Sequence, residues 1–163
     1  NGFFQHSSAK NLNLGLTGWA EGGSCIIDVA KYKKIGGFDS MYSPFYWEDI
    51  DLSYRAWKQG YTVLFEPSVL VEHHHESTIK SYFSNMYITS IAYRNQLLFI
   101  WKNIQDTNLL QEHKTALFKQ LIRSIFSDPA FISGYFRALA KNNDIINSTK
   151  PLLSDHEILT RFT

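Results

Sequence analysis

The sequence predicts an α/β portion over residues 1–77 and an α-helical extension over residues 78–163. Up to about Ser77, glycines punctuate short apolar runs of the strand type and one helical segment. Beyond Ser77 glycine nearly disappears and apolar residues recur at helical spacing. The apolar fraction of 44% is that of a packed globular protein, and 163 residues are enough for one ordinary domain or a small domain with an appendage.

Composition and termini narrow the classes of function. The formal charge of +1, with Lys and Arg scattered, argues against nucleic-acid binding. Cys25 is the only cysteine and lies in an apolar run, so we expect a buried, inert thiol and a reducing compartment. No apolar run approaches the ~20 residues of a membrane-spanning helix. Because the chain starts at Asn1 without a Met or a signal peptide, we expect a fragment.

In the first portion, residues 24–27 are expected to form a buried strand and residues 29–35 a short helix that stops at Gly36-Gly37. A helix is predicted over residues 48–59, because Ile50, Tyr54 and Trp57 share one face and Gly60 follows. Two short strands are then expected over residues 62–65 and 69–72, separated by Pro67, which cannot donate a ladder hydrogen bond.

In the extension, apolar residues at helical spacing predict one long helix over residues 79–101. Asn108 with Gln111 resembles a capping box that opens the next helix. Asp128-Pro129 is expected to end that helix and begin another, and Ser154 with Glu157 predicts a capping box for a short terminal helix.

Three carboxylates crowd the first turn of the helix predicted from residue 48, namely those of Glu48, Asp49 and Asp51. Acidic residues there can be simple caps, since the helix dipole stabilises each by roughly 0.3–1 kcal/mol. We assign Asp51 to structure, because Arg55 follows it at i, i+4. A catalytic role for the other two carboxylates remains the alternative to capping.

Several motifs favour the catalytic alternative when they are taken together. They are Gly22-Gly23-Ser24, Gly36-Gly37-Phe38-Asp39, Trp47-Glu48-Asp49-Ile50-Asp51-Leu52, Arg55, Gly60-Tyr61, Pro67 and His73. In this order and spacing, residues 14–77 are similar to the C-terminal portion of the catalytic domain of family 2 glycosyltransferases, which are inverting enzymes of the GT-A fold. The resemblance implies that residues 1–77 are that portion and that the N-terminal nucleotide-binding half is missing.

The resemblance also implies a reaction and a site. A sugar would move from a nucleotide-diphosphate donor to a glycan or lipid-linked hydroxyl, in polysaccharide or cell-envelope synthesis. Asp49 would deprotonate the acceptor, as an inverting displacement requires. Glu48 would hydrogen-bond sugar hydroxyls, and Gly22 and Gly23 would lie beside the donor sugar and acceptor. Trp47 would either stack on a sugar face or belong to the core.

A metal is implied by the same resemblance, in which His73 can be a ligand of Mn²⁺ or Mg²⁺ beside an Asp-x-Asp motif. No Asp-x-Asp precedes Gly18, and the only such spacing is Asp49-Ile50-Asp51. The site is therefore incomplete, and we expect weak metal binding. A separate zinc site at residues 73–75 is disfavoured, because alternate side chains of an extended segment face opposite ways.

Other interpretations stay open. Ser53, Arg55 and Trp57 also resemble a stretch of retaining transferases that glycosylate proteins, and the chain could be a non-catalytic helical interaction module on an incomplete transferase domain. The aromatic helices of the extension are expected to pack on the catalytic portion or another subunit, with a membrane surface as the alternative. We expect a cytoplasmic location, extending in that alternative to the inner face of the membrane, and an inactive isolated fragment.

Overall fold

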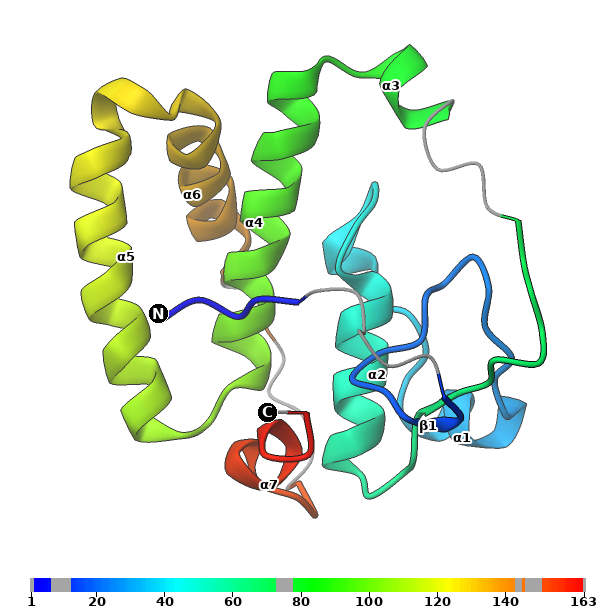
Figure 1. The fold of residues 1–163 in the computed structure, drawn as a ribbon. Helices are drawn as coiled ribbons and strands as arrows, with labels where there is room; N and C mark the ends of the chain where they lie inside the picture. Colours follow the sequence, from blue (N-terminus) through cyan, green and yellow to red (C-terminus); the bar gives the residue numbers. More distant parts are fainter. Residues whose placement is uncertain (1, 7–12, 73–77, 143–144, 146–150, 163) are drawn as a thin grey trace.

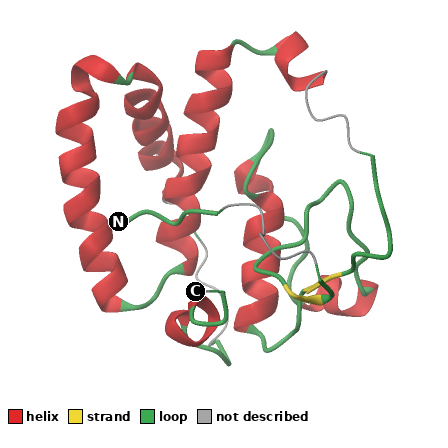
Figure 2. Ribbon diagram, viewed as in Figure 1, coloured by secondary structure: helices red, strands yellow, loops and turns green. Residues whose placement is uncertain are grey.

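The computed structural model describes residues 2–6, 13–72, 78–142, 145 and 151–162, and they are mostly helical (Figures 1 and 2). On one side lie three long helices, α4 (Asn85–Asn103), α5 (Thr107–Ser127) and α6 (Pro129–Lys141). On the other lie α1 (Val29–Lys34) and α2 (Glu48–Lys58), with long loops between them. None of the described helices combines the length and the apolar character needed to cross a bilayer.

The remaining elements are short. Strands β1 (Gly15–Leu16) and β2 (Leu64–Phe65) pair antiparallel, with Gly15 opposite Phe65. A single turn of 3-10 helix, η1 (Ser40–Tyr42), follows α1, and α3 (Thr78–Tyr82) precedes α4. The terminal helix α7 (Asp155–Leu159) lies close to the end of α2 (Figure 1).

Several predicted elements are confirmed. Helices α1 and α2 occupy their expected positions, and the cap residue Gln59 and then Gly60, with a φ of 73°, follow α2. Asp128 ends α5 and its side chain accepts a hydrogen bond from the N–H of Phe131, so one residue separates two helices. The capping box between Ser154 and Glu157 is present in both directions.

Two predicted helix boundaries are wrong. The helix expected over residues 79–101 is broken into α3 and α4, because Ser84 adopts an extended conformation and its side chain caps α4 by accepting from the N–H of Tyr87. Helix α5 begins earlier than the predicted capping box. Its cap is Asp106, whose carboxylate accepts from the N–H groups of Asn108 and Leu109.

Two predicted strands are absent, those over residues 24–27 and 69–72, and only residues 64–65 of the 62–65 strand are in a sheet. A strand exists only where a neighbour satisfies its backbone groups. Within the described part of the chain, the only strand pair is β1 with β2. Ile26 and Leu70 of the missing strands are instead 101% and 91% exposed. The two-layer α/β arrangement expected of a GT-A portion therefore stays a prediction.

The hydrophobic core is shared by both portions of the chain. Trp57 and Tyr42 from the first portion and Phe99 and Leu98 from the second are almost completely buried and belong to one cluster. The side chain of Phe4, in the N-terminal segment that crosses α4, packs against Phe99 with ring centroids 4.6 Å apart. Residues 1–77 and 78–163 thus differ in sequence pattern but are packed on each other.

Two buried carboxylates join the portions by polar contacts. Asp51 on α2 accepts from Lys102 Nζ at 2.9 Å and from Asn103 Nδ2 at 2.8 Å, both at the end of α4. Asp155 on α7 accepts from Tyr54 Oη at 2.5 Å and forms an ion pair with Lys58 at 2.6 Å. These contacts fix α2, which carries the candidate site, from two directions.

Candidate active site

Helix α2 begins in an unusual way. Tyr46 and Trp47 both have left-handed backbones, with φ of 71° and 76°, and Trp47 occupies the cap position without a side-chain cap. A positive φ at a bulky residue costs energy and persists only where the surroundings impose it. The backbone therefore turns sharply just before Glu48 and Asp49.

Helix α4 holds that turn in place. The buried amide of Asn95 donates to the carbonyl oxygens of Tyr42, Phe45 and Tyr46, at 2.7, 2.9 and 2.8 Å. Its neighbour Arg94 donates to the carbonyls of Tyr42 and Ser43. We name residues 42–47 the entry loop. The helical extension thus determines the conformation from which the candidate catalytic helix starts.

One face of α2 is lined by the segment that follows β1. The indole N–H of Trp57 donates to Thr17 O, the N–H of Ala20 donates to Ser53 Oγ, and the N–H of Gly22 donates to Asp49 Oδ2. The three α2 residues are four apart, so each contact lies one helical turn from the next. This register places Gly22 beside Asp49.

The structure brings together two of the sequence-predicted site residues, Asp49 and Gly22. The Gly22 N–H lies 3.3 Å from Asp49 Oδ2, while Asp49 Oδ1 accepts from the N–H of Ile50 at 2.8 Å. A Cβ on residue 22 would lie 3.7 Å from Asp49 Cβ. Gly23 follows in the same exposed turn. Asp49 itself is partly exposed at the first turn of α2, so its carboxylate is held in direction and open to solvent.

Glu48, the other carboxylate, is in a different environment. It is half-buried, and its Oε2 is a buried oxygen without a hydrogen-bond partner among the described residues. Burial, together with the nearby charge of Asp49, raises the pKa of Glu48. Two adjacent carboxylates are thus distinguished, one tethered by backbone N–H groups and one desolvated.

Trp47 belongs to the core, which was one of its two predicted roles. It is 6% exposed, and its ring contacts Phe4, His6 and Phe99 at centroid distances of 6.2, 5.3 and 5.3 Å. Cys25 departs from expectation because it is only partly buried. Desolvation and the charge of Asp49 raise the pKa of its thiol.

The predicted metal ligand His73 lies outside the described residues, as do His74 and His75. Asp51 is not available as the second carboxylate of an Asp-x-Asp site, because Arg55, Lys102, Asn103 and Tyr42 all donate to it in the protein interior. Across the part of the chain that the structure describes, no three His, Cys, Asp or Glu side chains converge. The described residues alone therefore do not make up a metal site, and the role of His73 stays a prediction.

A pocket of 440 Å³ lies at the far end of α2, between the ends of α1 and α4. Its cationic wall includes Arg55, Lys58 and Lys102, and neither Glu48 nor Asp49 lines it. The carboxylates Asp51 and Asp155 pair with these cations. The charged residues of this pocket therefore form ion pairs that hold the two portions of the chain together.

Sequence reasoning missed the residues that position the site from the extension, namely Arg94, Asn95, Lys102 and Asn103. All four are buried polar residues on α4. For Arg94 and Asn95 the available signal was their placement within the apolar periodicity of residues 79–101, where a polar residue on a buried face needs a partner, whereas Lys102 and Asn103 follow that segment. Their partners lie about 50 residues away in sequence, which no local pattern reveals.

Comparisons with known proteins give one line of similarity. No protein-family model and no solved structure matches the chain. It is 37% identical over 57 residues to N-acetylglucosaminyl-diphospho-decaprenol L-rhamnosyltransferases of Mycobacterium tuberculosis, from strains CDC 1551 / Oshkosh and ATCC 25618 / H37Rv. The match covers 35% of this chain and 18% of each relative. It supports a relationship to glycosyltransferases at that coarse level.

Proposed function

We propose that the chain carries the acceptor-side part of an inverting glycosyltransferase in cell-envelope glycan synthesis, acting on the cytoplasmic side of the membrane. A sugar would pass from a nucleotide-diphosphate donor to a glycan or lipid-linked hydroxyl. The observation that carries the proposal is the placement of Asp49, which is partly exposed and held by the N–H groups of Gly22 and Ile50. The curated relatives are named for transfer to a lipid-linked sugar, which supports an acceptor of that class.

The chemistry asked of Asp49 is a single proton transfer. The acceptor hydroxyl oxygen forms a bond to the anomeric carbon as the bond from that carbon to the diphosphate breaks, and the hydroxyl proton passes to the Asp49 carboxylate. Positive charge at the N-terminus of α2 stabilises the negative carboxylate before the reaction. The hydrogen bonds from Gly22 and Ile50 use one lone pair on each oxygen of the carboxylate and leave the others for the acceptor hydroxyl.

Glu48 is proposed to bind sugar hydroxyls rather than act as the base. Burial raises its pKa, so its carboxyl group takes up a proton more readily than an exposed glutamate does. Its buried Oε2 lacks a hydrogen-bond partner in the described protein, so binding a substrate hydroxyl requires the Glu48 side chain to turn outward.

The proposed metal ion, Mn²⁺ or Mg²⁺, has no complete site among the described residues. His73 remains the predicted protein ligand of this chain, and imidazole suits Mn²⁺ better than Mg²⁺. The nucleotide-binding half would have to supply the remaining ligands.

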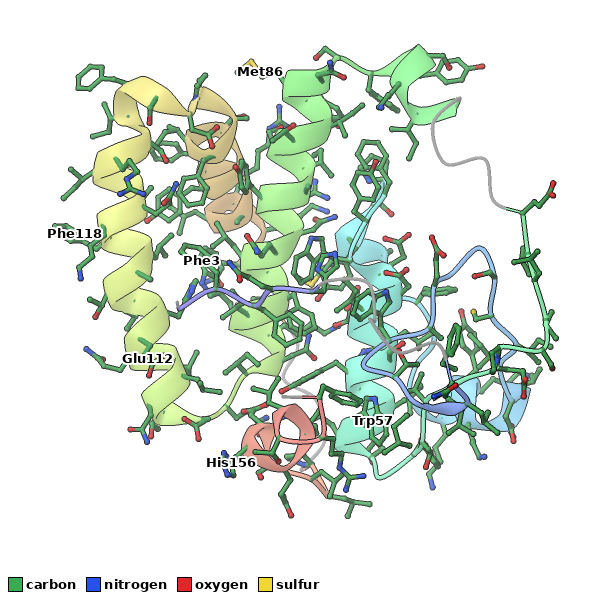
Figure 3. All side chains as sticks on the ribbon, viewed as in Figure 1. Phe3, Trp57, Met86, Glu112, Phe118 and His156 are labelled. Carbon is green, nitrogen blue, oxygen red and sulfur yellow. The ribbon has the colours of Figure 1, made fainter. Side chains whose placement is uncertain are left out.

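The test is Asp49→Asn in the polypeptide that joins this chain to its nucleotide-binding half. Transfer is measured from a panel of nucleotide-diphosphate sugars to a polyprenyl-diphosphate-linked sugar. We expect a roughly 10²–10⁴-fold fall in kcat with little change in KM, because the amide cannot accept the proton. The control is Glu112→Gln, an exposed carboxylate on α5 (Figure 3), which should transfer at the normal rate.

Two results would contradict the proposal. Unchanged transfer by the Asp49→Asn protein would leave this carboxylate with a capping role, and would favour a non-catalytic interaction module for this chain. A product that retains the anomeric configuration of the donor would remove the role assigned to Asp49, and would favour a retaining transferase.

A further inference from the structure

Helix α5 has a buried face toward the core and an apolar face on its opposite, exposed side. Its inward face contains the buried His113 and Ser124, and Leu117 packs against the core. Its outward face, which we name the outer stripe, has large apolar side chains where a helix of a soluble protein normally shows polar ones. The members of the outer stripe are Phe118, Ile122, Ile125 and Phe126, which are 66%, 57%, 57% and 98% exposed.

The outer stripe is a continuous surface. Its members follow Phe118 at i+4, i+7 and i+8, the spacing that keeps residues on one side of a helix. Figure 3 shows the side chain of Phe118 pointing away from α4 and α6. Scattered exposed apolar residues need no explanation, whereas four neighbours on one helical face indicate an interaction site.

Positive charge surrounds the outer stripe. Three exposed cations of the same helix, Lys114, Lys119 and Arg123, lie within or beside it. From residue 114 to residue 142 the only acidic residue is Asp128. Asp128 is already engaged, since it caps α6 and accepts from Tyr93 Oη at 2.9 Å. The surface is therefore both apolar and cationic.

We propose that the outer stripe of α5 binds the surface of an anionic membrane. Apolar side chains of an amphipathic helix enter the boundary between headgroups and acyl chains, while Lys and Arg reach the phosphates with their flexible stems. A second copy of the same stripe is a poorer occupant, because Lys114, Lys119 and Arg123 would meet their own counterparts. The positive charge of the surface therefore favours an anionic membrane over a second copy of the same stripe.

This surface does not depend on the chemistry of Asp49, and it adds a location to the proposed function. An enzyme that modifies a lipid-linked sugar gains from being held at the bilayer that contains its acceptor. Failure of the membrane proposal and failure of the catalytic proposal can be distinguished, because vesicle binding is measured without a sugar donor or acceptor.

The experiment is flotation of the full chain with vesicles of phosphatidylcholine, with and without 30% phosphatidylglycerol. We expect the chain to float with the anionic vesicles and not with the neutral ones, and to dissociate as NaCl rises from about 50 mM to 0.5 M, where the Debye length falls several-fold.

The informative variant is the double substitution Phe118→Ser and Phe126→Ser, which should lower the partition coefficient onto the vesicles roughly tenfold or more, because two large apolar side chains that enter the bilayer are lost. Its matched control is Ile26→Ser, in the other portion of the chain, because Ile26 is as exposed as Phe126. The control should float as the original protein does. Circular dichroism and thermal unfolding of each variant establish that it is folded.

Three outcomes would overturn the inference. They are equal flotation of the double variant and the original protein, equal binding to neutral and anionic vesicles, and no flotation of the folded original protein. In the third case, a dimer seen by light scattering that the double variant abolishes would identify a second copy as the occupant. The Asp49→Asn chain should bind vesicles normally, so failure of the catalytic proposal leaves this one intact.

Discussion

At the scale of single residues, two aspartates on helix α2 lie in different environments. Asp49 and Asp51 are two positions apart, so their side chains leave α2 about 200° from each other. Asp51 is completely buried and accepts from Arg55, Lys102, Asn103 and Tyr42, whereas Asp49 faces Gly22 and solvent. The same acidic cluster therefore supplies one structural anchor and one candidate base.

The sequence predicted part of this division. The structural role of Asp51 followed from its i, i+4 relation to Arg55, and the ion pair is present with atoms 2.7 Å apart. The donors from α4 could not be predicted, because Lys102 and Asn103 become neighbours of Asp51 only when two distant helices pack. The approach of Gly22 to Asp49 depends in the same way on the segment that lines α2.

His113 makes stability depend on pH. Its Nε2 accepts from Trp101 Nε1 at 3.0 Å, and its Nδ1 lies 2.7 Å from Gly2 O, which can only accept. The ring is therefore neutral, and burial lowers its pKa. In the unfolded chain His113 takes up a proton below about pH 6.5, so stability should fall as pH drops below that value and level off below the folded pKa.

The measurement is Tm between pH 7.5 and 5.5. His113→Gln should show a flatter dependence, since glutamine can accept from Trp101 without titrating. His156→Gln, at an exposed histidine of α7 (Figure 3), should keep the original slope. A His113→Gln protein with the original slope would assign the pH dependence to other groups.

At the scale of elements, α4 and α6 approach each other at Gly134. A Cβ at this position would lie 2.7 Å from Ser90 O and 2.8 Å from Tyr93 Cβ. Overpacking costs about 1–3 kcal/mol, against roughly 1 kcal/mol that alanine gains over glycine in a helix. Gly134→Ala should therefore lower the free energy of unfolding in urea.

Gly18→Ala is the matched control, because a Cβ at Gly18 meets no atom within 4 Å. This change should stay within about 0.5 kcal/mol of the original protein. If Gly134→Ala is as stable as Gly18→Ala, the close crossing of α4 and α6 is not required for the fold.

The entry loop should open more often when the hydrogen bonds from the Asn95 side chain are removed. Asn95→Ala removes three hydrogen bonds to loop carbonyls, and losing partners of buried groups costs about 1–3 kcal/mol. We expect chymotrypsin to cut after Phe45 or Tyr46 roughly tenfold faster, since local opening precedes cleavage.

The control for Asn95→Ala is the adjacent Gln96→Ala, because Gln96 donates to Phe4 O and not to the entry loop. Its cleavage at the loop should match that of the original protein. Equal cleavage of both variants would show that Asn95 does not hold the entry loop closed.

Helices were more predictable than strands for a physical reason. The helix bonds of α1 and α2 are made within the segment, so periodicity and stops such as Gly60 are sufficient signals. The apolar runs around Ile26 and Leu70 have strand composition, but their hydrogen bonds need a neighbour that composition does not name. The break at Ser84 was missed because the apolar pattern continues across it.

At the scale of the whole molecule, a change in sequence pattern near Ser77 does not separate two cores. Trp57 and Phe99 come from opposite sides of that position and belong to one cluster. Phe4 packs against both Trp47 and Phe99, so the N-terminal segment also takes part. Such long-range packing could not be inferred from patterns that describe one segment at a time.

The contacts of Asp155 have a consequence for synthesis of the protein. Its carboxylate accepts from Tyr54, 101 residues earlier, and from the N–H groups of Gln105 and Asp106. Until translation delivers Asp155, the ammonium group of Lys58 also lacks its ion-pair partner. The nascent chain therefore cannot lock α2 into its final position until Asp155 has left the ribosome, and the acidic helix start with Asp49 becomes fixed only from that point on.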